Sequence, residues 1–77
     1  MKHYITNEGV RYSAQNAASL VRQLKADSKT GGDIRKDDWR ADSAYRATEA
    51  TGSTVRGDSD AHFVLDLINA GLLKEEG

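Results

Sequence analysis

The 77-residue sequence contains no cysteine. Because disulfide frameworks and thiolate metal sites both require cysteine, folding must rest on apolar burial and backbone hydrogen bonds. Long apolar segments are also missing, since no run approaches the roughly 20 residues that a membrane-spanning helix needs. The opening residues MKHYITNEG lack the uninterrupted apolar segment of a signal peptide. We therefore expect a cytoplasmic protein that makes no contact with a membrane.

The sequence also lacks an excess of charge of either sign. Eleven Lys and Arg residues face twelve Asp and Glu residues, which gives a formal net charge of -1 at pH 7. A domain that holds nucleic acid by neutralising phosphates carries a clear positive excess, and a nucleic-acid mimic carries a negative one. The balance disfavours both classes, so direct binding to nucleic acid is not expected.

Large apolar residues are few, which limits the size of the core. Leu, Ile, Val and Phe together account for 14 of the 77 residues, and ten alanines, three tyrosines and one tryptophan supplement them. A chain of this length forms one small domain, 1–77, without room for a second core. Because so small a core often needs another molecule to cover its surface, we expect a partner protein or a homodimer.

The N-terminal residues predict a β-hairpin over residues 2–14. Two runs rich in aromatic and β-branched residues flank the three-residue loop Asn7-Glu8-Gly9. Gly9 supplies the positive φ that such a loop requires. In this register Tyr4 lies opposite Tyr12 on one face of the hairpin. Since two strands alone are marginal in water, we expect a helix to cover one face and a third strand to join the edge.

Three helices are predicted over residues 14–28, 35–51 and 59–70. The first and the last are indicated by apolar residues at spacings of three and four, each with a suitable N-cap residue nearby. Between the first two helices, the polar stretch 27–33 contains paired glycines that let the chain turn, and we expect it to be the most mobile internal segment. The apolar faces are Ala17, Leu20, Val21 and Leu24 in the first helix, and Ala61, Val64, Leu65 and Ile68 in the third, flanked by Phe63 and Leu67.

The middle helix allows two registers, one that buries Trp39 and one that buries Tyr45. Because burying the tryptophan removes more apolar area from water, we expect the first register, with Tyr45 facing outward. The Trp39 stripe continues through Ser43, Ala47 and Ala50 with Ala44 beside it, and the competing stripe contains Ala41, Ala44 and Thr48.

Glycines mark the ends of the second and third helices. Gly52 and Gly71 both fall where a left-handed C-terminal cap belongs, and Leu72 can close a Schellman motif. Short extended segments at 54–56 and 72–74 can add strands to the sheet. The fold class that follows is α+β, a small antiparallel sheet packed with three helices in the order β-β-α-α-α.

The residues that could carry chemistry form no recognisable constellation. His3 and His62 lie on different elements, and their spacing from the serines and aspartates predicts no catalytic triad. The acidic runs DDWRAD and GDSDA lack the further oxygen ligands and the closing glutamate of a calcium loop. We therefore expect a protein that is not an enzyme and that uses no cofactor and no metal.

The polar middle helix is the candidate interaction surface. Tyrosine and arginine are enriched at the centres of protein interfaces, and this helix carries both. Trp39 belongs to the same enriched group, but a chain this short needs its only tryptophan in the core. The candidate partner-binding residues are Arg40, Tyr45 and Arg46, supported by Arg22, Lys25 and Lys36.

Three segments give the chain its layout: YITNEGVRYSAQNAASLVRQLK, DDWRADSAYRATEATG and VRGDSDAHFVLDLINAGLL. This layout resembles short uncharacterised proteins of bacterial phages and mobile elements. The resemblance implies a non-enzymatic protein that docks onto host machinery, and anti-CRISPR proteins are one such class. The function expected from it is binding that occludes a surface of a host protein or ribonucleoprotein complex.

The alternative is a small DNA-binding regulator of a mobile element. The segment FVLDLINAGLLKEE resembles the end of a winged-helix recognition helix running into a wing strand. Recognition helices normally offer Arg, Lys, Asn or Gln to bases and phosphates, whereas residues 58–70 contain three aspartates and neither Lys nor Arg. The charges therefore favour the first function.

Overall fold

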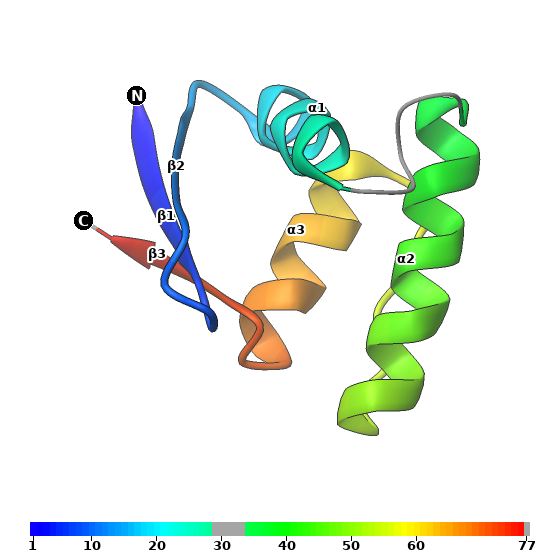
Figure 1. The fold of residues 1–77 in the computed structure, drawn as a ribbon. Helices are drawn as coiled ribbons and strands as arrows, with labels where there is room; N and C mark the ends of the chain where they lie inside the picture. The colour runs from blue at the N-terminus through cyan, green and yellow to red at the C-terminus, as the bar shows by residue number, and fades with distance from the viewer. Residues whose placement is uncertain (29–33, 77) are drawn as a thin grey trace.

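The computed structural model describes residues 1–28 and 34–76, so most of the stretch 27–33 that was expected to be mobile lies outside the described residues. The chain has the expected α+β fold, in which a three-stranded antiparallel sheet of order β2-β1-β3 lies beside three helices. Figure 1 shows all three helices on the same side of the sheet, with α2 farthest from it. The elements are β1 (Lys2–Thr6), β2 (Arg11–Ala14), α1 (Ala17–Asp27), α2 (Lys36–Thr51), α3 (Asp60–Asn69) and β3 (Leu73–Glu76).

The N-terminal hairpin has the register expected from its loop. Tyr4 pairs with Tyr12, and the Thr6 N–H donates to the Val10 carbonyl at 2.9 Å. Gly9 has a φ of 88°, a conformation that glycine adopts without steric cost, and its N–H donates back to the Thr6 carbonyl at 2.9 Å. The local chemistry of the loop therefore sets the pairing of the first two strands.

The third strand, β3, pairs with β1 and makes it the central strand of the sheet. A Schellman motif at the end of α3 turns the chain into it: Gly71 has a φ of 83°, and the Leu72 N–H donates to the Leu67 carbonyl at 3.0 Å. The extended segment expected at 72–74 is confirmed, with the strand beginning at Leu73.

The prediction of another short strand at 54–56 is wrong. Val55 is buried there, but its N–H donates to Thr48 Oγ1 at 2.9 Å, and the Arg56 N–H donates to Asp66 Oδ2 at 3.0 Å. Side chains of α2 and α3 thus satisfy the backbone groups that a strand would have offered to the sheet. The connector therefore belongs to the helical side of the molecule.

Helix α1 begins at Ala17, three residues later than expected, because β2 continues to Ala14. Its N-cap is Asn16, whose Oδ1 accepts the Ser19 N–H at 2.9 Å. In α3 the N-cap is Ser59, whose Oγ accepts the N–H of the residue three positions further along at 3.1 Å. Both helices therefore start where a side chain satisfies an otherwise unpaired backbone donor.

Helix α2 buries the face that contains Trp39, as expected. Trp39 is 6% exposed, whereas Tyr45 is 66% exposed. The tryptophan ring packs edge-to-face against Phe63 of α3, with ring centroids 6.0 Å apart. The indole N–H has no hydrogen-bond partner among the residues that the structure describes. Ala50, assigned to the same stripe, is exposed in the last turn of the helix.

Helix α3 buries a face that matches the expected one only in part: Val64 is buried and Ile68 packs against the core, but Ala61 is exposed. Phe63 and Leu67 are buried, whereas Leu65, assigned to the inner face, is 50% exposed. The reason is Asp66, which is only 7% exposed and receives two hydrogen bonds from the side chain of Arg56, at 2.8 and 3.2 Å. A carboxylate on the inner face interrupts the apolar pattern from which the sequence prediction was made.

The centre of the core is formed by Leu20 and Val21 of α1, which are both fully buried. Helix α1 contacts β2, α2 and α3, so these two side chains lie where the layers meet. Among the described residues, no helix is long and apolar enough to cross a membrane. The other buried apolar residues are Tyr4, Ala14, Trp39, Ala44, Ala47, Val55, Phe63, Val64, Leu67 and Leu73.

The substitution Leu20→Ala is expected to lower the free energy of unfolding by about 2–5 kcal/mol, because it leaves a cavity at the centre of the core. The matched control Leu65→Ala removes an exposed leucine and is expected to change it by about 0.5 kcal/mol or less. Urea denaturation followed by circular dichroism measures both. A large loss for Leu65→Ala would mean that α3 faces the other way.

The pH dependence of stability is expected to report the Arg56–Asp66 contact. Hydrogen bonds from the Arg56 side chain and backbone lower the pKa of Asp66 to about 2. Because the folded pKa lies below the unfolded value of about 3.9, this carboxylate stabilises the fold above about pH 4, and the stabilisation is lost as the pH falls toward 2. Asp66→Asn should therefore lose less stability than the wild type over that window. An Asp38→Asn control on the exposed surface should follow the wild type, and parallel curves for all three proteins would contradict the assignment.

Candidate functional site

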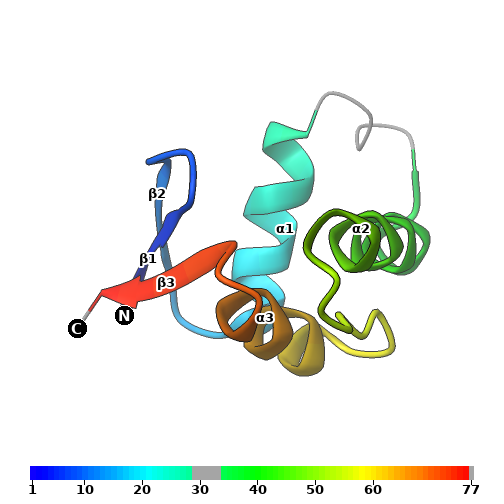
Figure 2. The ribbon, with the colours of Figure 1, turned by 90° about the horizontal axis from the view of Figure 1, so that it is seen from below.

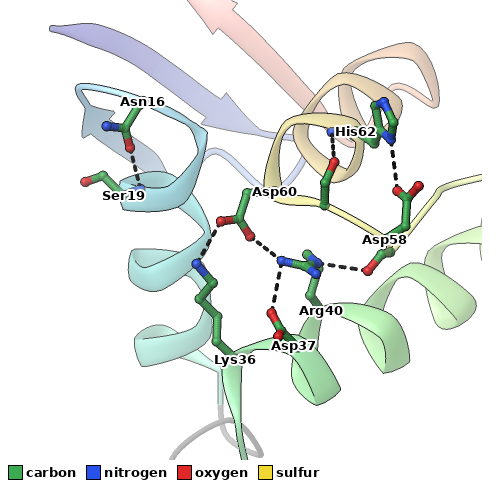
Figure 3. Close-up of polar contacts among 10 residues, drawn as sticks. Asn16, Ser19, Lys36, Asp37, Arg40, Asp58, Asp60 and His62 are labelled. Atoms are coloured by element: carbon green, nitrogen blue, oxygen red, sulfur yellow. Dashed lines mark hydrogen bonds and ion pairs between the residues drawn. The ribbon is translucent and has the colours of Figure 1, made fainter.

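The six predicted partner-binding residues do not form one surface. Arg40 and Lys36 point into the junction between α2 and the start of α3 (Figure 3). Tyr45 and Arg46 lie exposed on α2, and the last two predicted residues lie on α1. The three groups have different surroundings.

Arg40 is buried, which corrects its assignment as a surface contact. It is 7% exposed, and its Nη1 donates to Asp60 Oδ1 at 2.6 Å, while its Nε donates to the Gly57 carbonyl at 2.9 Å. Asp37 lies 3.3 Å from the same Nη1. The second oxygen of Asp60 accepts a hydrogen bond from Lys36 Nζ at 2.7 Å (Figure 3). Both predicted cations therefore hold α2 against the start of α3.

The connector between α2 and α3 passes close to α2 at Gly57, which brings the Gly57 carbonyl within reach of Arg40. A Cβ atom on Gly57 would lie 2.8 Å from the Cα of Ala41, so a larger residue would push the connector away from Arg40. Burial acts to raise the pKa of Asp60, but the hydrogen bonds from Lys36 and Arg40 outweigh it and leave that pKa below its ordinary value. Asp60 is therefore ionised at neutral pH and balances the buried guanidinium.

Tyr45 and Arg46 remain on the outer surface, where the sequence placed them. Helix α2 contacts only α1 and α3 among the described elements and stands at the end of the molecule away from the sheet (Figures 1 and 2). Arg46 is 55% exposed and pairs with Asp42 at 3.0 Å. Asp38 and Glu49 are also exposed on this helix, so the surface carries charges of both signs.

Arg22 and Lys25 belong to a separate part of the surface. Arg22 is exposed and lines a shallow hollow on α1, together with Ser19, Gln23 and Ala26. Lys25 is half-buried in the last turn of the same helix. Within residues 1–28 and 34–76, no hydrogen bond or ion pair links either cation to the exposed residues of α2.

Each histidine forms a pair with one neighbour. His3 Nδ1 lies 2.8 Å from Ser13 Oγ across the hairpin, and His62 Nδ1 lies 2.9 Å from Asp58 Oδ1 at the start of α3 (Figure 3). The hydrogen bond from His62 lowers the pKa of Asp58. In the described part of the chain, the only further side chains bonded to these pairs reach backbone atoms, Ser59 at the His62 N–H and Gln23 at the Ser13 carbonyl, and no group of three or more His, Asp or Glu residues is placed to hold a metal ion.

A groove that the sequence analysis did not anticipate lies between the hairpin loop and the C-terminal ends of α1 and α3. Its volume is about 420 Å³. The buried side chains of Leu67 and Leu73 contribute to its lining, and Glu8 and Asp27 are its two acidic residues. The complete lining is Thr6, Asn7, Glu8, Val10, Tyr12, Leu24, Asp27, Leu67, Leu72 and Leu73.

A hydrogen bond links two elements within this lining. The Tyr12 hydroxyl of β2 donates to Asp27 Oδ2, in the last residue of α1, at 2.8 Å. Burial, together with the adjacent carboxylate, raises the pKa of Tyr12 to about 12, so the hydroxyl stays protonated at neutral pH and keeps donating. The contact fixes the position of Asp27 relative to the sheet.

A scan against protein-family models, a search of curated proteins and a search of solved structures each found no match.

Arg40→Ala is expected to lower the free energy of unfolding by about 3 kcal/mol, because it removes a buried ion-pair partner of Asp60 and leaves the Gly57 carbonyl unpaired. Arg46→Ala removes an exposed pair within one helix and is expected to cost about 0.5 kcal/mol or less. Guanidinium denaturation of both variants beside the wild type measures the difference. Two equally small losses would show that Arg40 does not hold α2 in place.

Proposed function

We propose that the chain is a non-enzymatic binding protein that docks onto a larger protein, with Tyr45 and Arg46 at the contact. The observation that carries the proposal is the 66% exposure of Tyr45 on α2, beside an exposed arginine. Tyrosine, arginine and tryptophan are the residue types that most often contribute the largest share of the binding energy at protein interfaces. A helix fixes the backbone positions of both residues before binding, which reduces the conformational entropy lost on association.

Charge favours protein over duplex DNA as the partner of this surface. Arg46 is already paired with Asp42, and Asp38 and Glu49 are exposed on the same helix. A phosphate backbone would meet these carboxylates as well as the cation, whereas a protein surface can offer a matching pattern of both signs. The alternative function, a DNA-binding regulator, gains no support from this helix.

In its sharpest form, the proposal is a phage or mobile-element protein of the anti-CRISPR type. Such a protein would act in the cytoplasm of the host cell by covering a surface of a host protein or ribonucleoprotein complex. Covering a surface requires a fixed shape and a contact, and no catalytic group. The net charge of -1 supports this form, because the chain has no excess of cations with which to hold phosphate directly.

Affinity capture with the intact chain tests the proposal. Lysate of a candidate bacterial host is treated with nuclease or left untreated, and the captured proteins are identified by mass spectrometry. A defined protein complex should survive nuclease. The double variant Tyr45→Ala/Arg46→Ala should weaken the affinity of the chain for this complex at least about 30-fold, which corresponds to the loss of about 2 kcal/mol typical of dominant interface residues.

The control for this experiment is Leu65→Ala, which truncates an exposed apolar residue on α3 and should retain the complex. Capture that disappears with nuclease would favour the DNA-binding alternative. Capture that the α2 double variant retains in full would refute the assignment of the contact. If the chain binds only a second copy of itself, analytical sizing at two concentrations will show a homodimer and no host partner.

A further inference from the structure

The groove beside the hairpin loop is separate from the proposed contact on α2. Its lining residues come from β1, the hairpin loop, β2, α1, α3, the turn before β3 and the start of β3, and none comes from α2. Substitutions at either place can therefore be made without altering side chains of the other. The groove provides a second feature whose chemistry indicates a ligand.

The apolar part of the groove consists mainly of leucines. Leu67 and Leu73 are buried, and Leu24 and Leu72 are half-buried beside them. Val10 is 45% exposed at the hairpin loop, which leaves apolar surface open to a ligand. The volume of about 420 Å³ lies within the range of roughly 300–1,000 Å³ that ligand sites occupy. The groove can therefore take up an apolar group.

The charged residues that line the groove are all negative. Glu8 and Asp27 are the ionisable acids of the lining, and the lining contains no Lys, Arg or His. In residues 1–28 and 34–76, neither carboxylate forms an ion pair, and the one hydrogen bond received by a side-chain oxygen of Asp27 comes from the neutral hydroxyl of Tyr12. Lys25 lies in the same last turn of α1 but does not line the groove.

The position of Asp27 strengthens this negative charge. It is the last residue of α1, where the aligned peptide dipoles of the helix already give a partial negative charge. A carboxylate is electrostatically unfavourable at that end, and a cation is favourable. A positively charged ligand would therefore relieve a repulsion that the free protein contains.

We propose that the groove binds a short peptide segment of a partner protein, in which an apolar side chain packs on the leucines and a neighbouring Lys or Arg pairs with Glu8 and Asp27. A peptide can supply both groups from adjacent residues. Anionic membranes and nucleic acids are disfavoured, because the two carboxylates repel phosphate. Glu8 and Asp27 are both exposed, so the ion pair with the peptide stays accessible to salt and binding should weaken as salt concentration rises.

Selection of a displayed random heptapeptide library on the intact chain tests this proposal. The expected result is enrichment of peptides that contain an apolar residue next to Lys or Arg. The affinity of the best peptide, synthesised with a fluorescent label, is then measured by fluorescence polarisation. The double variant Glu8→Gln/Asp27→Asn should weaken binding at least tenfold. Asparagine keeps an oxygen that can accept the Tyr12 hydrogen bond, and thermal unfolding confirms that the variant is folded.

The matched control is Asp38→Asn/Glu49→Gln, which removes the same two charges from α2 and should bind the peptide as the wild type does. Tyr45→Ala should also leave peptide binding unchanged, so failure of the groove and failure of the proposed contact on α2 are distinguishable. The proposal is overturned if no peptide is enriched or if the selected peptides lack a cation. It is also overturned if spermidine alone binds, since the ligand would then be a small amine.

Discussion

The ion pair between Arg40 and Asp60 determines how α2 is attached to the rest of the molecule. Apart from Trp39, the buried apolar residues of this helix are alanines, which remove little area from water when they are buried. The guanidinium supplies the missing attachment, because it holds the connector and the first turn of α3 at fixed points along α2. The outward position of Tyr45 follows from this attachment, so an internal electrostatic contact defines the external surface.

Local signals predicted the parts of the fold that depend on neighbouring residues. The hairpin register follows from the Gly9 loop, and the caps at Gly52 and Gly71 follow from the left-handed conformation that glycine allows. The inner face of α3 was predicted only in part and the segment after α2 wrongly, because their positions depend on polar contacts between the connector and the two helices. Asp66 binds the Arg56 side chain and backbone, and Thr48 binds the Val55 backbone. Hydropathy patterns do not register such contacts.

The candidate sites were predicted in the same uneven way. The exposed position of Tyr45 follows from comparing its area with that of Trp39, whereas the prediction of Arg40 as a surface contact rests on the enrichment of arginine at protein interfaces. Its spacing of four from Ala44 placed it on the buried face and was the signal that could have revealed its role. The groove was missed since its lining is assembled from several elements. An aspartate at the C-terminal end of a helix was the one local indication of it.

The burial of the single tryptophan between α2 and α3 gives the molecule a built-in optical reporter. The indole is buried and packs against Phe63, so it is shielded from water while α2 is attached. Detachment of α2 would expose the ring to water and shift its fluorescence emission to longer wavelength, even with the sheet intact. The intrinsic emission of the unlabelled protein therefore distinguishes partial opening of the helical side from unfolding of the whole chain.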